Sequence, residues 1–283
     1  MGHALFVFGA AGSGKTTFCR NLREFCAPKR SLKLINLDPA QEEATDFDID
    51  LCDYITVGEV MDEMDFGPNG ALFYALQEMS DNIDELHLED FEDDFFVFDC
   101  PGQIELFLHS DILQKCVEKV KNFSKVAIVY LFDSSNFLNN QKLLYTLLCS
   151  TISTYRFNLP VLNVISKADL LEEDILDRIT SGQDLFEEEQ RIENISNEES
   201  IDSKQKGSEF ENKDNALNSK SSFDQKNNRM ISSMMEYINN NSMMNFFPIN
   251  WKDESTAENL LLFLDNILQR YDDEEPKEFK ACD

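Results

Sequence analysis

Residues 9–16 read Gly-Ala-Ala-Gly-Ser-Gly-Lys-Thr and match the pattern G-x-x-x-x-G-K-[ST]. Glycines in such a loop let backbone N–H groups curl around phosphate oxygens, and the N-terminus of the following helix adds a favourable dipole. Lys15 is the residue type that reaches the β- and γ-phosphates, and Thr16 the type that holds Mg²⁺. Because an apolar run precedes the loop and a helix-compatible stretch follows it, we interpret it as a phosphate-binding loop rather than a Gly-rich turn. The predicted nucleotide-binding residues here are Gly12, Ser13, Gly14, Lys15, Thr16 and Thr17.

A second motif, Phe98-Asp99-Cys100-Pro101-Gly102-Gln103, follows a buried apolar run. An Asp at a strand end after a phosphate-binding loop is typical of the Mg²⁺ shell, and the Gly102 N–H can sense a γ-phosphate. Gln103 stands where a water-orienting Gln stands in GTPases. The alternative is a strand-ending Asp followed by a turn, and the preceding phosphate-binding loop makes that interpretation the weaker one.

A third motif, Ser166-Lys167-Ala168-Asp169, resembles the guanine-reading N-K-x-D of GTPases, with Ser in place of Asn. Asp169 can accept hydrogen bonds from the N1–H and 2-amino groups of guanine, whereas adenine offers neither donor there. The Lys167 stem can cover the face of the base. Taken alone, a surface Lys and a helix-capping Asp would explain the tetrapeptide. The order of the three motifs, each at the carboxyl end of a predicted strand, favours a nucleotide site.

Asp38, in Asn36-Leu37-Asp38-Pro39-Ala40, ends another predicted strand and would face the same phosphates. It is a candidate to position water or the Mg²⁺ shell, although a turn-starting Asp before Pro explains it nearly as well. The predicted metal residues are therefore Thr16, Asp38 and Asp99. Further along, Gly67-Pro68-Asn69-Gly70 is a compact turn, and Pro68 suits the first turn of a helix because its missing N–H needs no partner there.

Strands and helices have to position these residues. Short continuous apolar runs, which are typical of strands buried on both faces, predict where the strands lie. Such runs occupy residues 4–8, 32–36, 95–99, 126–132, 160–166 and 246–250. Helix-compatible stretches lie between them at 15–26, 104–122, 137–157 and 255–270. This alternation predicts an α/β fold of the P-loop NTPase type, with a mostly parallel central sheet flanked by helices on both faces.

The domain organisation is predicted as one domain over residues 1–271, interrupted by a polar and acidic insertion at 181–229. The insertion is rich in Ser, Asn, Glu and Lys with only scattered apolar residues, so it is expected to be disordered. Residues 272–283 are expected to form a flexible acidic tail.

The formal net charge is −29, which disfavours direct binding to nucleic acid or to anionic membrane surfaces. The seven cysteines include no CxxC pair and only three histidines are present, so a zinc site is not expected. Frequent but odd-numbered cysteines fit a reducing compartment. Neither a signal peptide nor a membrane-spanning run is recognised, which predicts a soluble cytosolic or nucleocytoplasmic protein.

The motifs together resemble the GPN-loop GTPases, most closely the third eukaryotic paralogue of that family. The resemblance covers most of residues 4–180 and resumes near 230–270. The segments that carry it are GAAGSGKTT (9–17), NLDPA (36–40), GPNG (67–70), DCPGQIELF (99–107) and SKADLL (166–171).

The resemblance implies that a loop of Gly67, Pro68 and Asn69 crosses a dimer interface and approaches the nucleotide of the partner chain. Asn69 would then act in trans, and the implied catalytic set is Lys15, Asp38, Asn69, Asp99 and Gln103. It also implies GTP or GDP and Mg²⁺ as ligands, and another GPN-loop GTPase as partner, in a heterodimer with the first paralogue or in a homodimer. The implied role lies in RNA polymerase II assembly or nuclear import, together with polymerase subunits or assembly factors. The implied location is the cytoplasm, with shuttling to the nucleus left open.

The sequence departs from the family pattern in three places. Asp50-Leu51-Cys52 stands where Asp-Ile-Arg is usual, and Gln77 stands where Glu is usual. The fifth guanine-site motif is not clear, and Phe247-Pro248-Ile249-Asn250 is the candidate. Two alternatives to a hydrolysing switch stay open: a nucleotide-stabilised assembly scaffold with little turnover, and a MinD-like ATPase. The second is disfavoured by Asp169 and by Ala10, where that class carries a signature Lys.

Overall fold

The computed structural model describes residues 2–28, 30–41, 46–86, 88, 94–103, 106, 110–180, 230, 233–234 and 246–270. The expected insertion at 181–229 and the expected tail at 272–283 lie outside the described residues.

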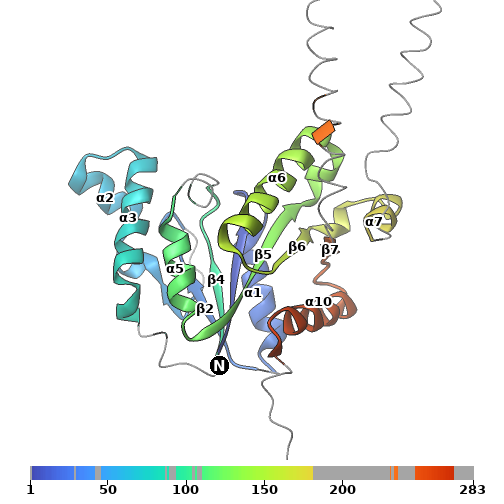
Figure 1. Ribbon diagram of the computed structural model, residues 1–283, viewed down its shortest axis with the longest axis horizontal. Coiled ribbons are helices and arrows are strands. Elements are labelled where there is room, and N and C mark those ends of the chain that lie inside the picture. The colour runs from blue at the N-terminus through green and yellow to red at the C-terminus, as the bar shows by residue number, and fades with distance from the viewer. Residues whose placement is uncertain are drawn as a thin grey trace, which may run out of the picture.

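The centre of the molecule is a seven-stranded sheet in the order β3-β2-β4-β1-β5-β6-β7 (Figure 1). Every strand pair in it is parallel. The strands are β1 (Gly2–Gly9), β2 (Leu32–Asn36), β3 (Ile49–Asp50), β4 (Phe95–Asp99), β5 (Ser124–Asp133), β6 (Val161–Ser166) and β7 (Phe246–Pro248). Because all strands run the same way, the loops after β1, β2, β4 and β6 emerge at one edge of the sheet. That edge brings the predicted motifs together.

Helices cover both faces of the sheet, as the alternation of elements predicts (Figure 1). They are α1 (Lys15–Cys26), α2 (Val57–Met64), α3 (Pro68–Asn82), α5 (Ile112–Val120), α6 (Asn140–Phe157), α7 (Glu173–Thr180) and α10 (Glu254–Ile267). Alternate residues of β1 point to opposite faces. Leu5 and Val7 join the core under α1 and α10, whereas Phe6 and Phe8 join the core under α3, α5 and α6.

The predicted fold class is confirmed, and the sheet is parallel throughout. The segments 15–26, 32–36 and 95–99 match α1, β2 and β4 to the residue. Gly67 is the N-cap of α3 and Pro68 lies in its first turn, as the turn sequence indicates.

Several predicted boundaries and element counts are wrong. Of the helix predicted over 104–122, α5 covers Ile112–Val120, and residues 104–105 and 107–109 lie outside the described residues. Residues 137–139 precede α6, and α10 ends at Ile267 instead of residue 270. The strand predicted over 246–250 ends at Pro248. The elements β3, α2 and α7 were not predicted, so Asp99 ends the fourth strand along the chain and Ser166 the sixth.

Candidate functional site

The loop between β1 and α1 has the backbone shape of a phosphate cradle. Gly14 is the N-cap of α1 with φ 88°, a left-handed conformation that glycine adopts without strain. No described side chain caps this helix start, so the N–H groups of its first turn point into the loop. Ser13 is buried, and its backbone N–H donates to the Ala10 carbonyl at 3.1 Å. Thr17 is exposed at the start of α1.

Lys15 and Thr16 join the loop to the end of β4. Lys15 is 8% exposed, and its Nζ donates to the Ala10 carbonyl at 3.3 Å. Thr16 Oγ1 donates to Asp99 Oδ2 at 2.6 Å, across 83 residues of sequence. The structure therefore brings together three of the predicted residues, Lys15, Thr16 and Asp99, at the centre of the sheet edge.

Asp99 is a buried carboxyl group with one oxygen left free. It is 2% exposed, and Oδ1 has no hydrogen-bond partner among the described residues. Burial raises its pKa to about 6; the Thr16 hydrogen bond and Lys15 lower it, and the charge of Asp38 raises it. A buried acceptor without a partner costs free energy unless a ligand fills the place. Asp99 Oδ1 is therefore suited to a cation or to a water molecule bound to one.

Asp38 faces the same region from the end of β2, and its conformation is fixed by a small network. Asp38 Oδ1 accepts from the Ala40 N–H at 3.1 Å, and its own N–H donates to Asn36 Oδ1 at 2.8 Å. Asn36 Nδ2 donates to Asp50 Oδ1 at 2.7 Å. Burial raises the pKa of Asp38, while the Ala40 N–H and Lys15 lower it. Its carboxylate thus lies near Lys15, and no ion pair neutralises it among the described residues.

Cys52, the departure from the family pattern, belongs to this network. Its Sγ lies 3.6 Å from the Asp38 carbonyl and 3.8 Å from the Gln41 carbonyl, and its N–H donates to Asp50 Oδ1 at 2.9 Å. Burial first, and then the Asp50 carboxylate, raise the pKa of the thiol to about 11. Cys52 is therefore a neutral packing and hydrogen-bonding group that fixes the loop carrying Asp38.

Gly102 lies directly against the phosphate-binding loop. A Cβ atom at this position would lie 2.8 Å from Lys15 Nζ and 2.8 Å from the Ala11 Cα. Only glycine allows this approach of the backbone to the loop. Gln103, the next residue, is half-buried, and its carbonyl accepts from the Leu106 N–H at 3.2 Å. Both residues thus lie at the predicted edge.

Ser166 and Lys167 connect the end of β6 to the phosphate-binding loop. Ser166 Oγ donates to the Ser13 carbonyl at 2.7 Å, so Ser makes a contact to the loop although it is shorter than Asn. Lys167 has φ 55° and donates from Nζ to the Gly12 carbonyl at 3.1 Å and to Asp133 Oδ2 at 2.5 Å. Asp133 was not predicted as a site residue; its position at the end of β5 was the available signal. Burial raises the pKa of Asp133, but the hydrogen bonds that it accepts from Lys167 and Ser135 outweigh this effect and lower the pKa below its usual value.

A pocket of about 200 Å³ lies beside these residues. Asp169 lines it together with Lys167 and Thr17, and the opposite wall is the segment Ile249–Lys252 after β7. Trp251 packs edge-on against Phe18 of α1, with ring centroids 5.6 Å apart. The predicted fifth motif, 247–250, thus contributes its last two residues, while Trp251 and Lys252 were missed. Lys252 Nζ lies 3.8 Å from Asp169 Oδ2.

Gly67, Pro68 and Asn69 are exposed and do not line the pockets around the phosphate-binding loop. Among the described residues, the Asn69 side chain has no hydrogen-bond partner. Gln77, the other departure on α3, donates to Asp81 at 2.9 Å within the helix. A single copy of the chain therefore does not bring Asn69 to the residues assembled around Lys15.

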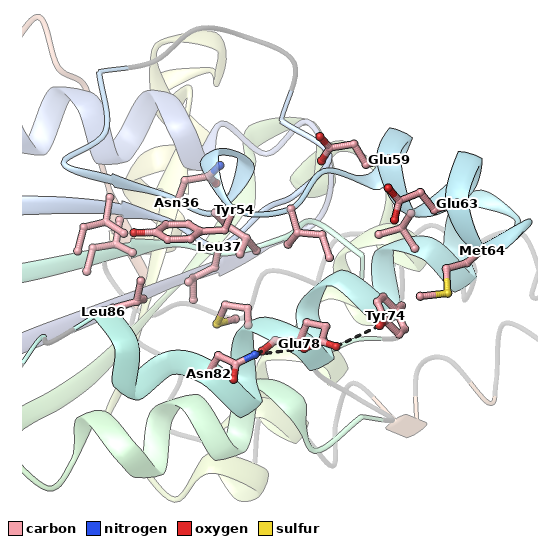
Figure 2. Close-up of a pocket in the computed structure, with 16 residues that line it drawn as sticks. Asn36, Leu37, Tyr54, Glu59, Glu63, Met64, Tyr74, Glu78, Asn82 and Leu86 are labelled. Carbon is pink, nitrogen blue, oxygen red and sulfur yellow. Dashed lines mark hydrogen bonds between the residues drawn. The ribbon is translucent and has the colours of Figure 1, made fainter.

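A larger pocket, of about 520 Å³, lies between the β2 and β3 strands and the helices α2 and α3 (Figure 2). Its walls are mostly apolar, and Glu59, Glu63 and Glu78 are the acidic side chains among its lining residues. Asn36 lines this pocket and also belongs to the Asp38 network. The pocket thus shares one residue with the network at the end of β2, but none with the pockets around the phosphate-binding loop.

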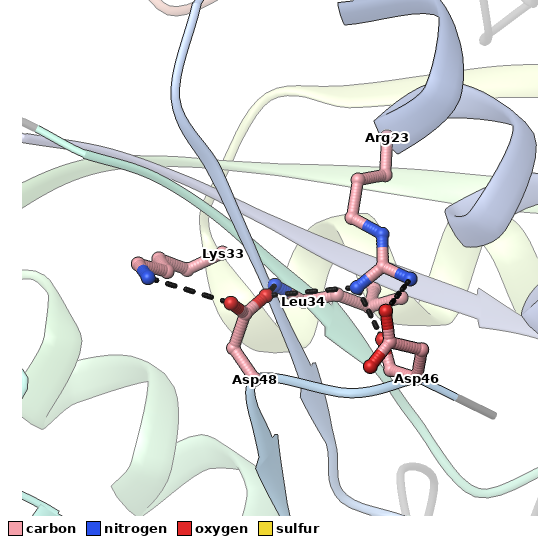
Figure 3. A network of polar contacts seen from close by, with 5 residues as sticks. All are labelled: Arg23, Lys33, Leu34, Asp46 and Asp48. Carbon is pink, nitrogen blue, oxygen red and sulfur yellow. Dashed lines mark hydrogen bonds and ion pairs between the residues drawn. The ribbon is translucent and has the colours of Figure 1, made fainter. Parts of the chain in front are cut away.

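The chain that leads from Asp38 to β3 is attached to α1 and β2 by charged residues (Figure 3). Arg23 of α1 donates to the Asp46 carbonyl and lies 3.7 Å from Asp48 Oδ2. Asp48 also accepts from the Leu34 N–H at 2.8 Å and pairs with Lys33 at 3.4 Å. These contacts fix the far end of the segment that begins at Asp38.

The oxygen ligands at this edge suit a magnesium ion that also binds a phosphate better than an ion held by protein groups alone. Within the described part of the chain, no group of three or more His, Cys, Asp or Glu side chains is placed to hold a metal ion. Mg²⁺ usually keeps waters and takes only one or two carboxylates together with substrate phosphates. Thr16, Asp99 with its free Oδ1, and Asp38 fit such a set.

None of the described helices combines the length and the apolar character needed to cross a membrane.

The chain is similar to a protein family, to individual relatives and to a solved structure. A sequence model for the family described as "Conserved hypothetical ATP binding protein" matches residues 7–270. The chain is 33% identical to GPN-loop GTPase 3 of Dictyostelium discoideum, over 98% of this chain and 90% of that protein. It is 31% identical to GPN-loop GTPase 3 of Saccharomyces cerevisiae, over 97% of this chain and 95% of the relative. A GTPase from Pyrococcus abyssi, solved in its apo form, has a TM-score of 0.65 at 21% identity, covering 94% and 97% of the two chains. That likeness concerns the fold.

Proposed function

The chain belongs to the GPN-loop GTPase family, and we propose that it is a Mg²⁺-dependent GTP switch whose site is completed by the Gly-Pro-Asn loop of a partner chain. GTP binding and hydrolysis follow from the family. The observation that carries the proposal for this chain is the contact of Thr16 with Asp99, beside the buried Lys15. The Asp99 carboxylate oxygen left free there is buried and has no hydrogen-bond partner among the described residues.

In this proposal the phosphates lie in the loop after β1. The N–H groups of Gly12, Ser13, Gly14, Lys15 and Thr16 surround them, because the first turn of α1 has no described side-chain cap. Lys15 gives up its 3.3 Å contact with Ala10 and pairs with the β- and γ-phosphates. Thr17, which lines the neighbouring pocket, contacts the nucleotide at the start of the helix.

Thr16, Asp99 and Asp38 would hold Mg²⁺, directly or through water. When bound, the ion neutralises charge that develops on the phosphate oxygens. The protein supplies the fixed acceptors: Asp99 is held by Thr16 at 2.6 Å, and Asp38 by the Asn36 and Cys52 network. The raised pKa of Asp99, about 6 without ligand, then falls when a cation faces the carboxylate.

For hydrolysis, Gln103 and Asp38 orient the attacking water at the γ-phosphate, and the Gly102 N–H binds a phosphate oxygen. The close approach of Gly102 to Lys15 supports this placement. Asn69 comes from the partner chain, since its own loop is exposed and lies away from the pockets around the phosphate-binding loop. Pro68 keeps that loop stiff, which limits the entropy lost on docking.

For base recognition, Asp169 accepts from guanine N1–H and the 2-amino group, and the Lys167 stem covers the base. Ser166 fixes the strand end to the loop through its 2.7 Å hydrogen bond to Ser13. Lys252, at 3.8 Å from Asp169, belongs to an exposed ion pair, and such pairs contribute little stability, so a base can displace it. Guanine is favoured over adenine because an adenine would leave Asp169 facing an acceptor.

In the cell, we propose a role in RNA polymerase II assembly or nuclear import, in a dimer with another GPN-loop chain. The site of action would be the cytoplasm, with shuttling to the nucleus left open. We also propose that residues 1–271 form one domain with 181–229 as an insertion.

The scaffold alternative, in which GTP stabilises the dimer and turnover is incidental, is favoured by one observation. Cys52 stands where the family carries an Arg, so one cation is missing near Asp38.

A titration of the purified chain with GTP, GDP and ATP in the presence of Mg²⁺ tests the proposal, with phosphate release followed in parallel. Guanine preference with Mg²⁺-dependent release of phosphate is the expected result. Binding without release would favour the scaffold. Equal affinity for ATP and GTP would remove Asp169 from base recognition and overturn the assignment of substrate.

A further inference from the structure

The carboxyl ends of β5 and β6 meet beside the phosphate-binding loop. Asp133 ends β5 and lies opposite Ser166 in the parallel register, so the next residue on β6's side is Lys167. Asp133 Oδ1 accepts from the Ser135 N–H at 2.9 Å, and Asp133 Oδ2 accepts from Lys167 Nζ at 2.5 Å. The two carboxylate oxygens thus have separate tasks. Oδ1 caps the turn that follows β5, and Oδ2 holds a residue of the proposed base site.

Lys167 is fixed at its backbone and at the end of its side chain. Its φ of 55° is a left-handed conformation, which is unfavourable for any residue other than glycine. Its side chain is 45% exposed, and a lysine in that position normally samples many rotamers. Here Nζ has two acceptors, the Gly12 carbonyl at 3.1 Å and the Asp133 carboxylate. The stem between them is therefore held in one orientation.

Of these two acceptors, Asp133 is the stronger one. A hydrogen bond between an ammonium and a carboxylate is shorter and stronger than one to a neutral carbonyl. Asp133 also directs Lys167 away from Asp169, the carboxylate two residues further along. Among the described residues, the ion pair of Asp169 is with Lys252, and none joins it to Lys167. Asp133 therefore leaves Asp169 available for a ligand.

The Asp133–Lys167 pair also connects two pockets that adjoin the phosphate-binding loop. Asp133 lines the pocket of about 250 Å³, and Lys167 lines the pocket of about 200 Å³ that contains Asp169. Next to the pair, Ser166 Oγ donates to the Ser13 carbonyl at 2.7 Å and lies 3.2 Å from a carbonyl of β5. The end of β6 is thus attached to the loop through Ser166 and through Lys167, and to β5 through the same two residues.

We propose that Asp133 is a positioning residue for nucleotide binding, which acts through Lys167 to orient one wall of the base pocket relative to the phosphate-binding loop. That this pocket takes a purine rests on the proposed function. Asp133 itself touches neither the base nor the phosphates, because its oxygens are directed to Ser135 and Lys167. Its loss should therefore weaken the contribution of the base to affinity and leave the binding of phosphates alone nearly unchanged.

The variant Asp133→Asn separates the two tasks of the carboxylate. An Asn oxygen can still accept from the Ser135 N–H, since Asn caps such turns as well as Asp does. Its NH₂ group then faces the Lys167 ammonium, and two donors cannot pair. Affinities for GTP and for tripolyphosphate are measured with Mg²⁺ by displacement of a fluorescent GTP. Their ratio isolates the base and ribose, because the lost negative charge affects both probes alike. We expect Asp133→Asn to lower the ratio by at least about fivefold.

A double-mutant cycle shows whether Asp133 acts through Lys167. Lys167→Met removes the ammonium and keeps an unbranched stem. In that background, Asp133→Asn is expected to change the ratio by less than about twofold, because the partner is already absent. A general structural effect of Asp133 would persist in both backgrounds. Asp84→Asn is the matched control, since it breaks an Asp–Lys pair of the same kind, with Lys119 at 2.9 Å, and should leave the ratio unchanged.

Thermal unfolding is measured on the same samples, and Asp133→Ser, which also caps a turn, replaces Asp133→Asn if that variant does not fold. A wild-type ratio in the variant, or an equal fall in both backgrounds, would overturn the positioning role. A wild-type chain that binds GTP no more tightly than tripolyphosphate would overturn it too, together with the base pocket. Equal affinity for GTP and ATP, with the fall in ratio and its dependence on Lys167 intact, would refute guanine recognition in the proposed function and still support the role of Asp133.

Discussion

Asp99 is a buried carboxyl group whose charge depends on what fills the site. Without ligand its pKa is about 6, above the 3.8 of an unfolded chain. The folded state therefore binds more protons than the unfolded state between these pH values, and folding stability falls as pH rises through them. Above pH 6 the full cost of ionising the buried group is present, about 3 kcal/mol by linkage, and below pH 4 it is absent.

The first prediction follows from this fall of folding stability with rising pH. In the absence of nucleotide and Mg²⁺, Asp99→Asn should be more stable than the wild type at pH 8, by about 1–3 kcal/mol. The difference should vanish as pH falls toward 4. Urea unfolding across this pH range measures it, with Asp84→Asn, an exposed carboxylate, as the control. Equal stability of the two proteins at pH 8 would contradict the raised pKa.

The second prediction concerns Lys15. Lys15→Ala removes the cation proposed to pair with the phosphates, and hydrogen bonds to charged groups contribute about 1.5–3 kcal/mol. Affinity for GTP should fall by about 100-fold. Lys115→Ala, an exposed lysine of α5, should leave it unchanged. Fluorescence titration with a labelled GTP measures both, and retained affinity in Lys15→Ala would place the phosphates elsewhere.

At the scale of the elements, α3 presents Asn69 at its exposed N-terminal end, away from the pockets around the phosphate-binding loop. The third prediction is that Asn69→Ala leaves GTP affinity intact and slows hydrolysis, because the side chain acts only across an interface. A single lost hydrogen bond in a transition state corresponds to a loss of roughly 10- to 100-fold. Single-turnover phosphate release measures it. Asn82→Ala, at the opposite end of α3, is the control, and unchanged release in Asn69→Ala would exclude the loop from catalysis.

The segment that follows α1 is joined to α10 by a buried ion pair. Arg30 Nη1 and Nη2 contact the Asp265 oxygens at 2.7 and 2.9 Å, and the two side chains are 9% and 8% exposed. The Arg30 guanidinium also lies over the Phe95 ring at 5.3 Å. Through α1, this pair supports the helix whose N-terminus is proposed to bind phosphate.

The fourth prediction is that Asp265→Ala destabilises the chain by about 3–5 kcal/mol, because a buried cation loses its partner. The double variant Arg30→Met, Asp265→Leu should cost less, since apolar side chains of similar size fill the space. Asp84→Ala, which breaks the exposed pair with Lys119, should cost less than about 1 kcal/mol. Denaturant unfolding compares the three, and an equal loss for Asp265→Ala and Asp84→Ala would show that the buried pair is unimportant.

The elements also show what could be predicted from the sequence. Strands buried on both faces, such as Phe95–Asp99, are continuous apolar runs and are found to the residue. By contrast, β3 has two residues, too few to make a pattern. Helix α2 was missed although its capping box, Thr56 with Glu59, is a local signal.

In the site, the phosphate-loop, Asp99 and Asp169 motifs were recognisable because each is a local sequence. The contacts of Cys52 with Asp38 and of Lys167 with Asp133 were not, because they join separate segments.

At the scale of the whole molecule, net charge opposes self-association. Two copies of −29 each repel through solvent, and salt screens that repulsion with a Debye length of about 10 Å at 0.1 M. Tyr145, Ile152 and Tyr155 make the outer face of α6 apolar, so salt does not weaken contacts made there. An interface made of ion pairs, or a complex with nucleic acid, would respond in the opposite direction, because salt weakens both.

The fifth prediction is therefore that self-association of the GTP-bound chain tightens as NaCl rises from about 0.05 to 0.5 M, by several-fold in the dissociation constant. Sedimentation at a series of salt concentrations measures it. Ile152→Glu should associate less than the wild type at every concentration, because screening cannot remove the cost of burying its carboxylate. Weaker association at high salt would indicate an interface held by charge pairs. In that case the contact lies on the charged surfaces of the molecule rather than on the outer face of α6.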